Sequence, residues 1–275
     1  MKPKKITESD WTPENIRRLW DWYGTNSHVQ PSYFSFLVGY GIVNFLEATG
    51  KMRGRVLDYG CGPGHLLSHF LKRTILECYG VDSSKESVLK TKNRLGNHAN
   101  FKEAVAINSW SAPYPDGFFD VITLVETVEH LSNDAAAAVL GEIKRLIKPG
   151  GIIMITTPFA ENLEVDSIYC PFCNSEFHKW QHMRSFSKES LASLITGLGL
   201  TVEFCENMDF GRFQENLEVW PLNLNKIYNF IMRSRRAFLD WVSPLPFPKG
   251  REFRSRIKYS MGKHLCLIAI KTEQK

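Results

Sequence analysis

Three ionisable side chains occur within five residues of one another, directly after an apolar run. Glu126, Glu129 and His130 follow the segment 119–125, which reads FDVITLV. A histidine titrates near neutral pH, so a well-placed imidazole can take a proton from a hydroxyl group that acts as a nucleophile. His130 is therefore the predicted general base, and Glu129 and Glu126 complete the candidate catalytic group.

A glycine-rich segment predicts a second kind of site. Asp58 is followed by YGCGPG, and Asp82 ends the next apolar run. Glycines let a backbone approach a bound cofactor without a Cβ clash, and a helix N-terminus behind them favours a carboxylate. A dinucleotide fingerprint needs glycines at positions 60, 62 and 65, but position 65 is histidine. The spacing therefore argues against a nicotinamide cofactor, while Asp82 suits a ribose in either case.

A cysteine and histidine cluster predicts a metal site. Cys170 and Cys173 form a CxxC pair, and His178 and His182 follow within the next nine residues. Thiolates two residues apart can form a zinc knuckle, and histidines four residues apart can share a helix face. Two alternatives stay open: the four residues are unrelated, or a histidine joins His130 at the active site and leaves the cysteines without a full ligand set.

The elements that must position these residues alternate between strands and helices. Alternation at this spacing predicts a doubly wound parallel sheet with helices on both faces. The predicted strands are 55–59, 78–82, 100–107, 119–125 and 152–157, with two further strands at 201–205 and 264–271. The carboxyl ends of such strands face a ligand crevice, which is where both the glycine segment and Glu126 fall.

Three segments lie outside this alternation. Residues 1–50 predict a helical N-terminal lid, with helices at 13–23 and 33–46, before a catalytic domain at 51–275. Insertions are predicted at about 159–186, which carries the possible zinc knuckle, and at about 206–262. The second insertion contains most of a basic stretch, residues 226–263, which hold ten Lys or Arg against two Asp or Glu. That stretch predicts contact with an anionic acceptor or a membrane surface, or simply a solvated face.

The sequence resembles the class I S-adenosylmethionine-dependent methyltransferase family. The resemblance covers about residues 53–160 and rests on four motifs in the expected order: VLDYGCGPG at 56–64, GVDSS at 80–84, FFDVITLVETVEHL at 118–131 and LIKPGGIIMITTP at 146–158. It implies a Rossmann-like, seven-stranded, mostly parallel sheet. It also implies an S-adenosylmethionine site made by Asp58, Gly60, Cys61, Gly62, Gly64, Asp82, Ser83, Asn108 and Glu126.

The ExxEH pattern at 126–130 is similar to that of ubiquinone-pathway O-methyltransferases and of small-RNA 2′-O-methyltransferases. This resemblance implies that Glu126, Glu129 and His130 can hold a divalent metal, which would lower the pKa of the attacking hydroxyl. In the alternative, Glu129 and His130 only cap the following turn and touch the cofactor.

The apolar runs and the net charge of the sequence narrow the location and the partners of the protein. The longest apolar runs are strand-sized, so no transmembrane segment is expected, and the opening residues lack the apolar run of a secretory signal. A cytoplasmic protein is therefore predicted. The net charge of +5 is small and no nucleic-acid-binding motif occurs, so a nucleic-acid partner is not expected. The predicted reaction is O-methylation of a small hydroxylated molecule, and the rival hypotheses are a catalytically silent methyltransferase-like partner and a nicotinamide-dependent oxidoreductase.

Overall fold

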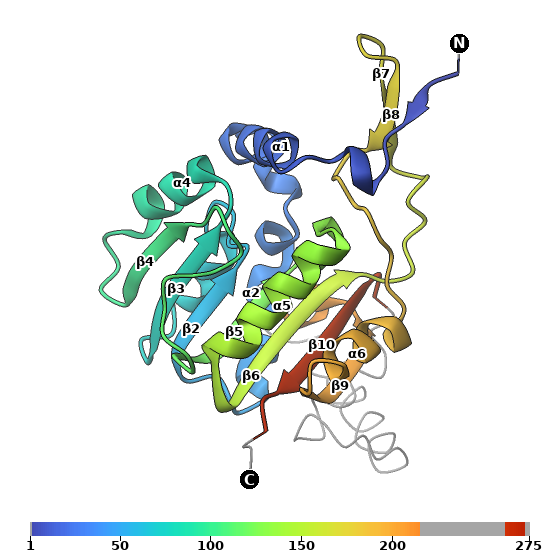
Figure 1. Ribbon diagram of the computed structural model, residues 1–275. Helices are drawn as coiled ribbons and strands as arrows, with labels where there is room; N and C mark the ends of the chain where they lie inside the picture. The colour runs from blue at the N-terminus through green and yellow to red at the C-terminus, as the bar shows by residue number, and fades with distance from the viewer. Residues whose placement is uncertain (1, 215–261, 273–275) are drawn as a thin grey trace, which may run out of the picture.

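The computed structural model describes residues 2–214 and 262–272 (Figure 1). The predicted basic stretch therefore lies outside the described residues, apart from its last two positions. Within the described part, a seven-stranded sheet forms the centre of the molecule, in the order β4-β3-β2-β5-β6-β10-β9. Its strands are β2 (Gly54–Tyr59), β3 (Leu76–Asp82), β4 (Phe101–Ala106), β5 (Phe119–Val125), β6 (Ile147–Pro158), β9 (Thr201–Met208) and β10 (His264–Ile270).

The sheet is mostly parallel, as the sequence predicted. The first five strands in this order pair in parallel, whereas β10 runs antiparallel to both β6 and β9. The chain leaves β2 toward β3 on one side and returns through β5 on the other. The strand order therefore reverses between β2 and β5, which is the position where open α/β sheets bind ligands.

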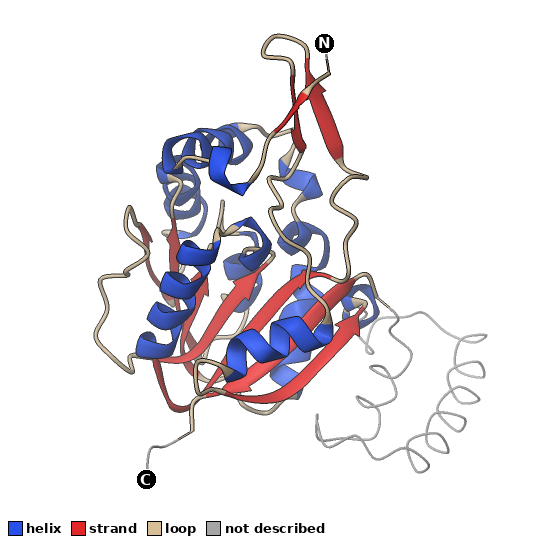
Figure 2. Ribbon diagram, turned by 45° about the vertical axis from the view of Figure 1, so that its right-hand side comes forward, coloured by secondary structure: helices blue, strands red, loops and turns tan. Residues whose placement is uncertain are grey.

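Helices cover both faces of the sheet (Figure 2), and alternating side chains along each strand supply a separate core to each face. Leu57 and Ile122 face α5 (Asn133–Leu146) and α6 (Lys188–Thr196), while Val56 and Val121 face α2 (Phe34–Ala48) and α3 (His65–Phe70). All four strand residues are fully buried. A further helix, α4 (Lys85–Leu95), follows β3 and begins at Ser84, whose side chain accepts a hydrogen bond from the Ser87 amide.

The N-terminal 50 residues divide into two parts with different roles. Helix α1 (Pro13–Thr25) begins at Thr12, whose hydroxyl caps the Asn15 amide, and Pro13 occupies its first position as predicted. This helix lies across the carboxyl edge of the sheet (Figure 1). Helix α2 instead buries Ile42, Phe45 and Leu46 in the core. The first turn of α2 still reaches the cavity, which Phe34 and Leu37 line, so both halves of the N-terminal segment contribute to it.

The segment 159–186 leaves the main sheet and forms a hairpin. Strands β7 (Ser167–Cys170) and β8 (Ser175–His178) pair antiparallel, and β1 (Lys4–Lys5) adds a parallel third strand. The hairpin extends away from the body of the molecule beside the N-terminus (Figure 1). Within residues 2–214 and 262–272, no helix is long and apolar enough to cross a membrane. Short 3-10 turns complete the fold at Glu8–Asp10, Gln30–Ser32, Val128–His130 and Phe210–Phe213.

Candidate active site

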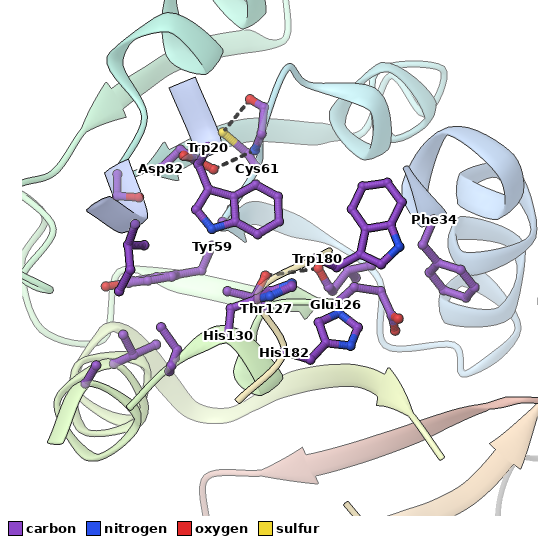
Figure 3. A pocket seen from close by; sticks show the side chains of 18 of the residues that line it. Trp20, Phe34, Tyr59, Cys61, Asp82, Glu126, Thr127, His130, Trp180 and His182 are labelled. Carbon is purple, nitrogen blue, oxygen red and sulfur yellow. Dashed lines mark hydrogen bonds between the residues drawn. The ribbon is translucent and has the colours of Figure 1, made fainter. Parts of the chain in front are cut away.

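A cavity of about 1270 Å³ opens at the carboxyl edge of the sheet (Figure 3). The ends of β2, β3 and β5 form one side of it, and α1 with the segment 178–182 forms the other. Of the predicted cofactor residues, those that line the cavity are Gly60, Cys61, Gly62, Asp82, Ser83, Asn108 and Glu126. The cavity also reaches His130, so the predicted cofactor and catalytic groups share one space.

Asp82 holds the glycine loop through its carboxylate. One oxygen, Oδ2, accepts from the Gly62 amide at 2.8 Å, and Oδ1 accepts from the Ser84 amide at 2.8 Å. Burial raises the pKa of Asp82, and these backbone donors oppose that effect. Gly60 and Gly62 have φ angles of 82° and 50°, which favour glycine. A Cβ at Gly60 would lie 2.7 Å from the Thr127 hydroxyl, so the close approach of these loops also requires glycine there.

Two predicted cofactor residues are not among those that line the cavity. Asp58 is buried and accepts a 2.8 Å hydrogen bond from Thr123 Oγ1, and burial raises its pKa to about 7. Gly64 has φ 79°, and a Cβ there would lie 2.9 Å from the Thr91 side chain. Asp58 therefore supports the loop from within the protein, and Gly64 allows α3 to approach α4 closely.

The loop after β4 closes the other end of the cofactor side. Asn108, which the sequence predicted, lines the cavity together with Ile107 and Trp110. The Tyr59 hydroxyl donates to the Trp110 carbonyl, so the glycine segment and this loop are connected. Sequence reasoning missed Trp110 because nothing in its surroundings resembles a motif.

Glu126 lies where β5 ends, in a left-handed conformation with φ 45°. Such a conformation is strained for a residue other than glycine, and it aims the carboxylate across the cavity. Oε1 accepts from Thr156 Oγ1 at 2.9 Å, and Oε2 lies 2.9 Å from His264 Nδ1. Burial lowers the pKa of His264, but the charge and hydrogen bond of Glu126 outweigh it and raise the pKa overall. The His264 ring also stacks on Phe34, with 4.0 Å between centroids.

Glu129 and His130 lie in the next turn and are both buried. Neither carboxylate oxygen of Glu129 makes a hydrogen bond of good geometry among the described residues, although the Thr157 side chain lies close enough to oppose the effect of burial on its pKa and Oε1 lies 3.9 Å from His130 Nε2. Burial, followed by the charge of Glu126, raises the pKa of Glu129 well above its ordinary value. Burial and then His182 lower the pKa of His130 well below its ordinary value, and His130 Nδ1 has no partner. The pair thus favours a neutral acid beside a neutral imidazole.

His178, His182 and Glu161 form a cluster that joins His130. His182 Nδ1 lies 2.5 Å from Glu161 Oε2, and His178 Nε2 lies 3.6 Å from Glu161 Oε1. The ring centroids of His182 and His130 are 4.7 Å apart. Among the described residues, Glu129, His130 and His182 form one group whose ligand atoms all lie within 4.8 Å, and Glu161, His178 and His182 form another. Carboxylates and imidazoles at this spacing fit a divalent cation.

The structure separates the four residues of the predicted zinc knuckle. Ser167 of β7 pairs with His178, whereas Cys170 pairs with Ser175, so Cys170 and His178 lie at opposite ends of the hairpin. Three residues of strand correspond to about 10 Å, which is far beyond the span of a single zinc site. Cys173 lies in the turn beyond Cys170. The structure instead matches the alternative in which the histidines lie beside His130. The strand pairing that brings them there could not be read from any motif in the sequence.

Helix α1 covers this cluster with aromatic side chains. Trp20 Nε1 donates to Gln181 Oε1 at 2.9 Å, and Gln181 Nε2 donates to the His130 carbonyl at 2.9 Å. The Trp20 ring meets the His130 ring edge-on at 4.7 Å, and Tyr23 stacks on Trp180 at 5.2 Å. One wall of the cavity is therefore fixed by a helix that the sheet itself does not require.

Fold and site together define a Rossmann-like class I enzyme that binds S-adenosylmethionine. The sequence family described as a methyltransferase domain matches residues 36–203, and the chain belongs to it. It is an S-adenosylmethionine-dependent methyltransferase. The motifs quoted above therefore identified both the fold and the class of enzyme.

Individual relatives are distant. Norajmaline N-methyltransferase of Rauvolfia serpentina is 24% identical over 74% of this chain and 67% of its own length. Ubiquinone biosynthesis O-methyltransferase of Bordetella pertussis is 27% identical over 78% of this chain and 88% of its own length. Among solved structures, the complex between the Haloferax volcanii Trm112 methyltransferase activator and its methyltransferase contains a chain with a TM-score of 0.56 at 15% identity, covering 92% of this chain and 98% of that one. The latter similarity shows the fold alone.

Proposed function

We propose that this enzyme transfers the methyl group of S-adenosylmethionine to a hydroxyl group of a small molecule. The observation that carries the proposal is the buried cluster of Glu129, His130 and His182 at the end of β5, where several polar atoms lack partners within the described protein. Buried polar groups are nearly always paired, so an unpaired cluster beside a cavity indicates a ligand. A small molecule fits because the predicted cofactor residues and His130 line one cavity.

The side chains divide the work between two ends of the cavity. Gly60, Gly62 and Asp82 suit the methionine and ribose parts of the cofactor, with Asn108 beside the adenine position. S-Adenosylmethionine supplies an electrophilic methyl group when bound. Methyl transfer from a sulfonium is an in-line displacement, so the protein must hold the acceptor oxygen against that methyl and exclude water. Trp20 and its neighbours on α1 suit this second task, because they cover the acceptor end.

A hydroxyl acceptor must also lose its proton, and two arrangements of the cluster can remove it. In the first, neutral His130 accepts the proton directly. In the second, Glu129, His130 and His182 hold a divalent cation, which lowers the pKa of a hydroxyl bound to it. The unpaired carboxylate of Glu129 favours the second arrangement, since a buried acid without hydrogen bonds gains most from a cation. Glu126, engaged with His264 and Thr156, lies beside this set rather than within it.

Glu161 suits a supporting role toward the cation. A carboxylate on one nitrogen of a histidine fixes the tautomer, so that the other nitrogen can act as a ligand. The 2.5 Å contact between Glu161 and His182 Nδ1 leaves His182 Nε2 for that purpose.

The acceptor class follows from chemistry rather than from the relatives, which include both N- and O-methyltransferases by name. A cation beside a base favours a vicinal diol or catechol, as found in sugars, phenols and quinone precursors. A catalytically silent partner protein is the rival hypothesis. The paired Asp82 and the acceptor cluster favour an enzyme. The cytoplasmic location and the peripheral membrane contact stay predictions, and the basic stretch that suggested the latter lies outside the described residues.

Titration calorimetry with S-adenosylhomocysteine, with NADH as the comparison ligand, tests the cofactor. Binding of the former alone is expected, and a folded protein that binds neither would favour the silent partner. A catechol or diol acceptor is then assayed after chelator treatment, with and without Mg²⁺ or Mn²⁺. Restored turnover supports the cation, while full turnover in the chelator leaves His130 as the base. No methylation of any hydroxyl acceptor, together with methylation of an amine, would overturn the proposal.

A further inference from the structure

The tip of the β7–β8 hairpin has the geometry of half a metal site. Cys170 ends β7, Cys173 lies in the turn, and Asn174 adopts a left-handed conformation with φ 50°. Hydrogen bonds from the Cys173 backbone, the Cys173 thiol and the Phe172 backbone lower the pKa of Cys170. Backbone amides that point at a cysteine sulfur stabilise the thiolate form, which is the form that binds metal.

The described part of the chain does not complete this site. Zinc in structural sites takes four ligands, and the turn supplies two. All six cysteines and all eight histidines of the sequence lie in the described residues. Cys61, Cys78 and Cys266 are buried in the main body, and His178 lies at the far end of the hairpin. Within the described residues, no group of three or more metal-ligating side chains includes Cys170 or Cys173.

The same tip exposes an unusual amount of apolar surface. Phe172 is 98% exposed, Tyr169 53% and Ile168 43%. The hairpin extends from the body of the molecule (Figures 1 and 2), so another protein can approach the tip without meeting the rest of the chain. Apolar side chains beside two free thiols suit a contact with another protein chain. Such a contact would bury the aromatic rings and at the same time supply the missing zinc ligands.

We propose that two copies of this chain join through their hairpin tips around one zinc ion, held by Cys170 and Cys173 of each copy. A two-fold axis through the metal supplies the two missing thiolates from an identical turn, and such isologous contacts are the commonest in soluble oligomers. Each thiol gives its proton to solvent as its sulfur binds, so four protons leave when one Zn²⁺ is taken up. The Phe172 rings of the two copies cover the site from solvent.

The test compares the full-length protein with Cys170→Ser and with a matched control, Cys205→Ser, which removes a half-buried thiol in β9. Each is loaded with zinc, and its mass and zinc content are measured by native mass spectrometry and by light scattering. The wild type and the control are expected to be dimers. Cys170→Ser is expected to be a monomer that holds half a zinc fewer per chain, whatever zinc the Glu129 cluster binds.

A second variant tests the apolar contact without touching the ligands. Phe172→Ser is expected to keep the bound zinc and to weaken the dimer about a hundredfold or more, since each of the two copies loses a ring and burial of one such ring is worth roughly tenfold or more. Three outcomes would overturn the proposal: a monomer that retains zinc at the cysteines, a dimer that Cys170→Ser does not disturb, or an intramolecular Cys170–Cys173 disulfide that persists in reductant and binds no zinc.

Discussion

Two carboxylates at or beside the cavity, those of Asp82 and Glu129, are held by the protein in different ways. On the cofactor side, Asp82 accepts backbone hydrogen bonds on both of its oxygens, from Gly62 and Ser84. On the acceptor side, Glu129 is fully buried and neither of its oxygens makes a hydrogen bond of good geometry among the described residues. Burial raises the pKa of both groups; backbone amides oppose the rise at Asp82, whereas at Glu129 its own backbone and the Thr157 side chain oppose it and the pKa still rises well above its ordinary value.

The fold alone supplies hydrogen-bond partners to the Asp82 carboxylate, whereas we expect a ligand to supply them to the Glu129 carboxylate. A carboxylate held by backbone amides is already in place before any cofactor arrives, so little reorganisation is needed on binding. A buried acid without hydrogen bonds is costly, and such a cost persists only where function requires it. We therefore expect cofactor binding to need little reorganisation, and we expect a cation or substrate bound at the proposed acceptor side to stabilise the protein.

The largest effect is expected from His130→Ala. Loss of a positioned base or metal ligand should lower kcat/KM about 10³-fold, within the range that such groups contribute. The affinity for S-adenosylhomocysteine should stay within a factor of three, because the cofactor side does not depend on His130. Steady-state kinetics and calorimetry measure the two quantities. His98→Ala, an exposed control, should change neither. Equal losses in both measurements would show that the two sides are not separate.

Asp82→Asn is expected to weaken cofactor binding while it leaves the His130 cluster in place. An amide can accept with only one of its two terminal atoms, so one of the backbone bonds and the ribose contacts are weakened. Hydrogen bonds to charged groups are worth about 1.5–3 kcal/mol each, so S-adenosylhomocysteine should bind about 100-fold more weakly. Asp120→Asn, at the opposite end of the sheet where the residue pairs with Lys148, is the matched control. Unchanged affinity in Asp82→Asn would exclude it from the cofactor site.

The sequence predicted the cofactor side far better than the acceptor side, and the reason is physical. Asp58, Gly60 and Asp82 belong to one strand-turn-helix unit and the strand beside it, so their spacing along the chain reflects their spacing in space. The motifs therefore identified the fold, and seven of the nine predicted cofactor residues line the cavity. Gly64 and Asp58 are in this motif too, although they support the loop from behind.

The acceptor side depends on pairings between distant segments, which spacing does not encode. His182 reaches His130 because the chain returns from the hairpin and docks through Gln181. His264 meets Glu126 because β10 runs antiparallel beside β6, so that its first residue lies opposite Pro158. Cys170, Cys173, His178 and His182 are close in sequence and were predicted to form one cluster. The pairing of β7 with β8 instead places Cys170 and His178 three strand residues apart. Closeness along the chain therefore suggested a closeness in space that the strand pairing excludes.

Glu129→Gln should stabilise the protein while it removes one ligand of the proposed metal site. The pKa of Glu129 in the folded state lies above its ordinary value of 4.5, so folded protein loses stability as pH rises from 4.5 toward that raised pKa. Glutamine has no such dependence. The variant should therefore melt a few degrees higher than the metal-free wild type at pH 8, at about 2–4 °C for each kcal/mol regained. The gain should vanish below about pH 4.5.

Differential scanning calorimetry in chelator across this pH range measures the effect, with Glu203→Gln, a half-buried residue of β9 paired with Lys51, as the control. Added Mg²⁺ or Mn²⁺ should raise the melting temperature of the wild type but not of Glu129→Gln. A variant that is less stable than the wild type at pH 8 would show that the carboxylate is satisfied in solution and that the contrast with Asp82 does not hold.

The smallest effect concerns the helix that lies over both sides. Trp20→Phe keeps a ring against His130 but removes the donor to Gln181, so one buried acceptor is left unpaired at a cost of about 1 kcal/mol. If α1 only shields the acceptor end, KM for the acceptor should rise about fivefold while cofactor affinity is unchanged. Trp22→Phe, two residues along the same helix and 54% exposed, should alter neither. Because Asp21 of this helix also accepts a 2.6 Å hydrogen bond from Ser84, beside Asp82, a parallel loss of cofactor affinity in Trp20→Phe would instead show that α1 couples the two ends of the cavity.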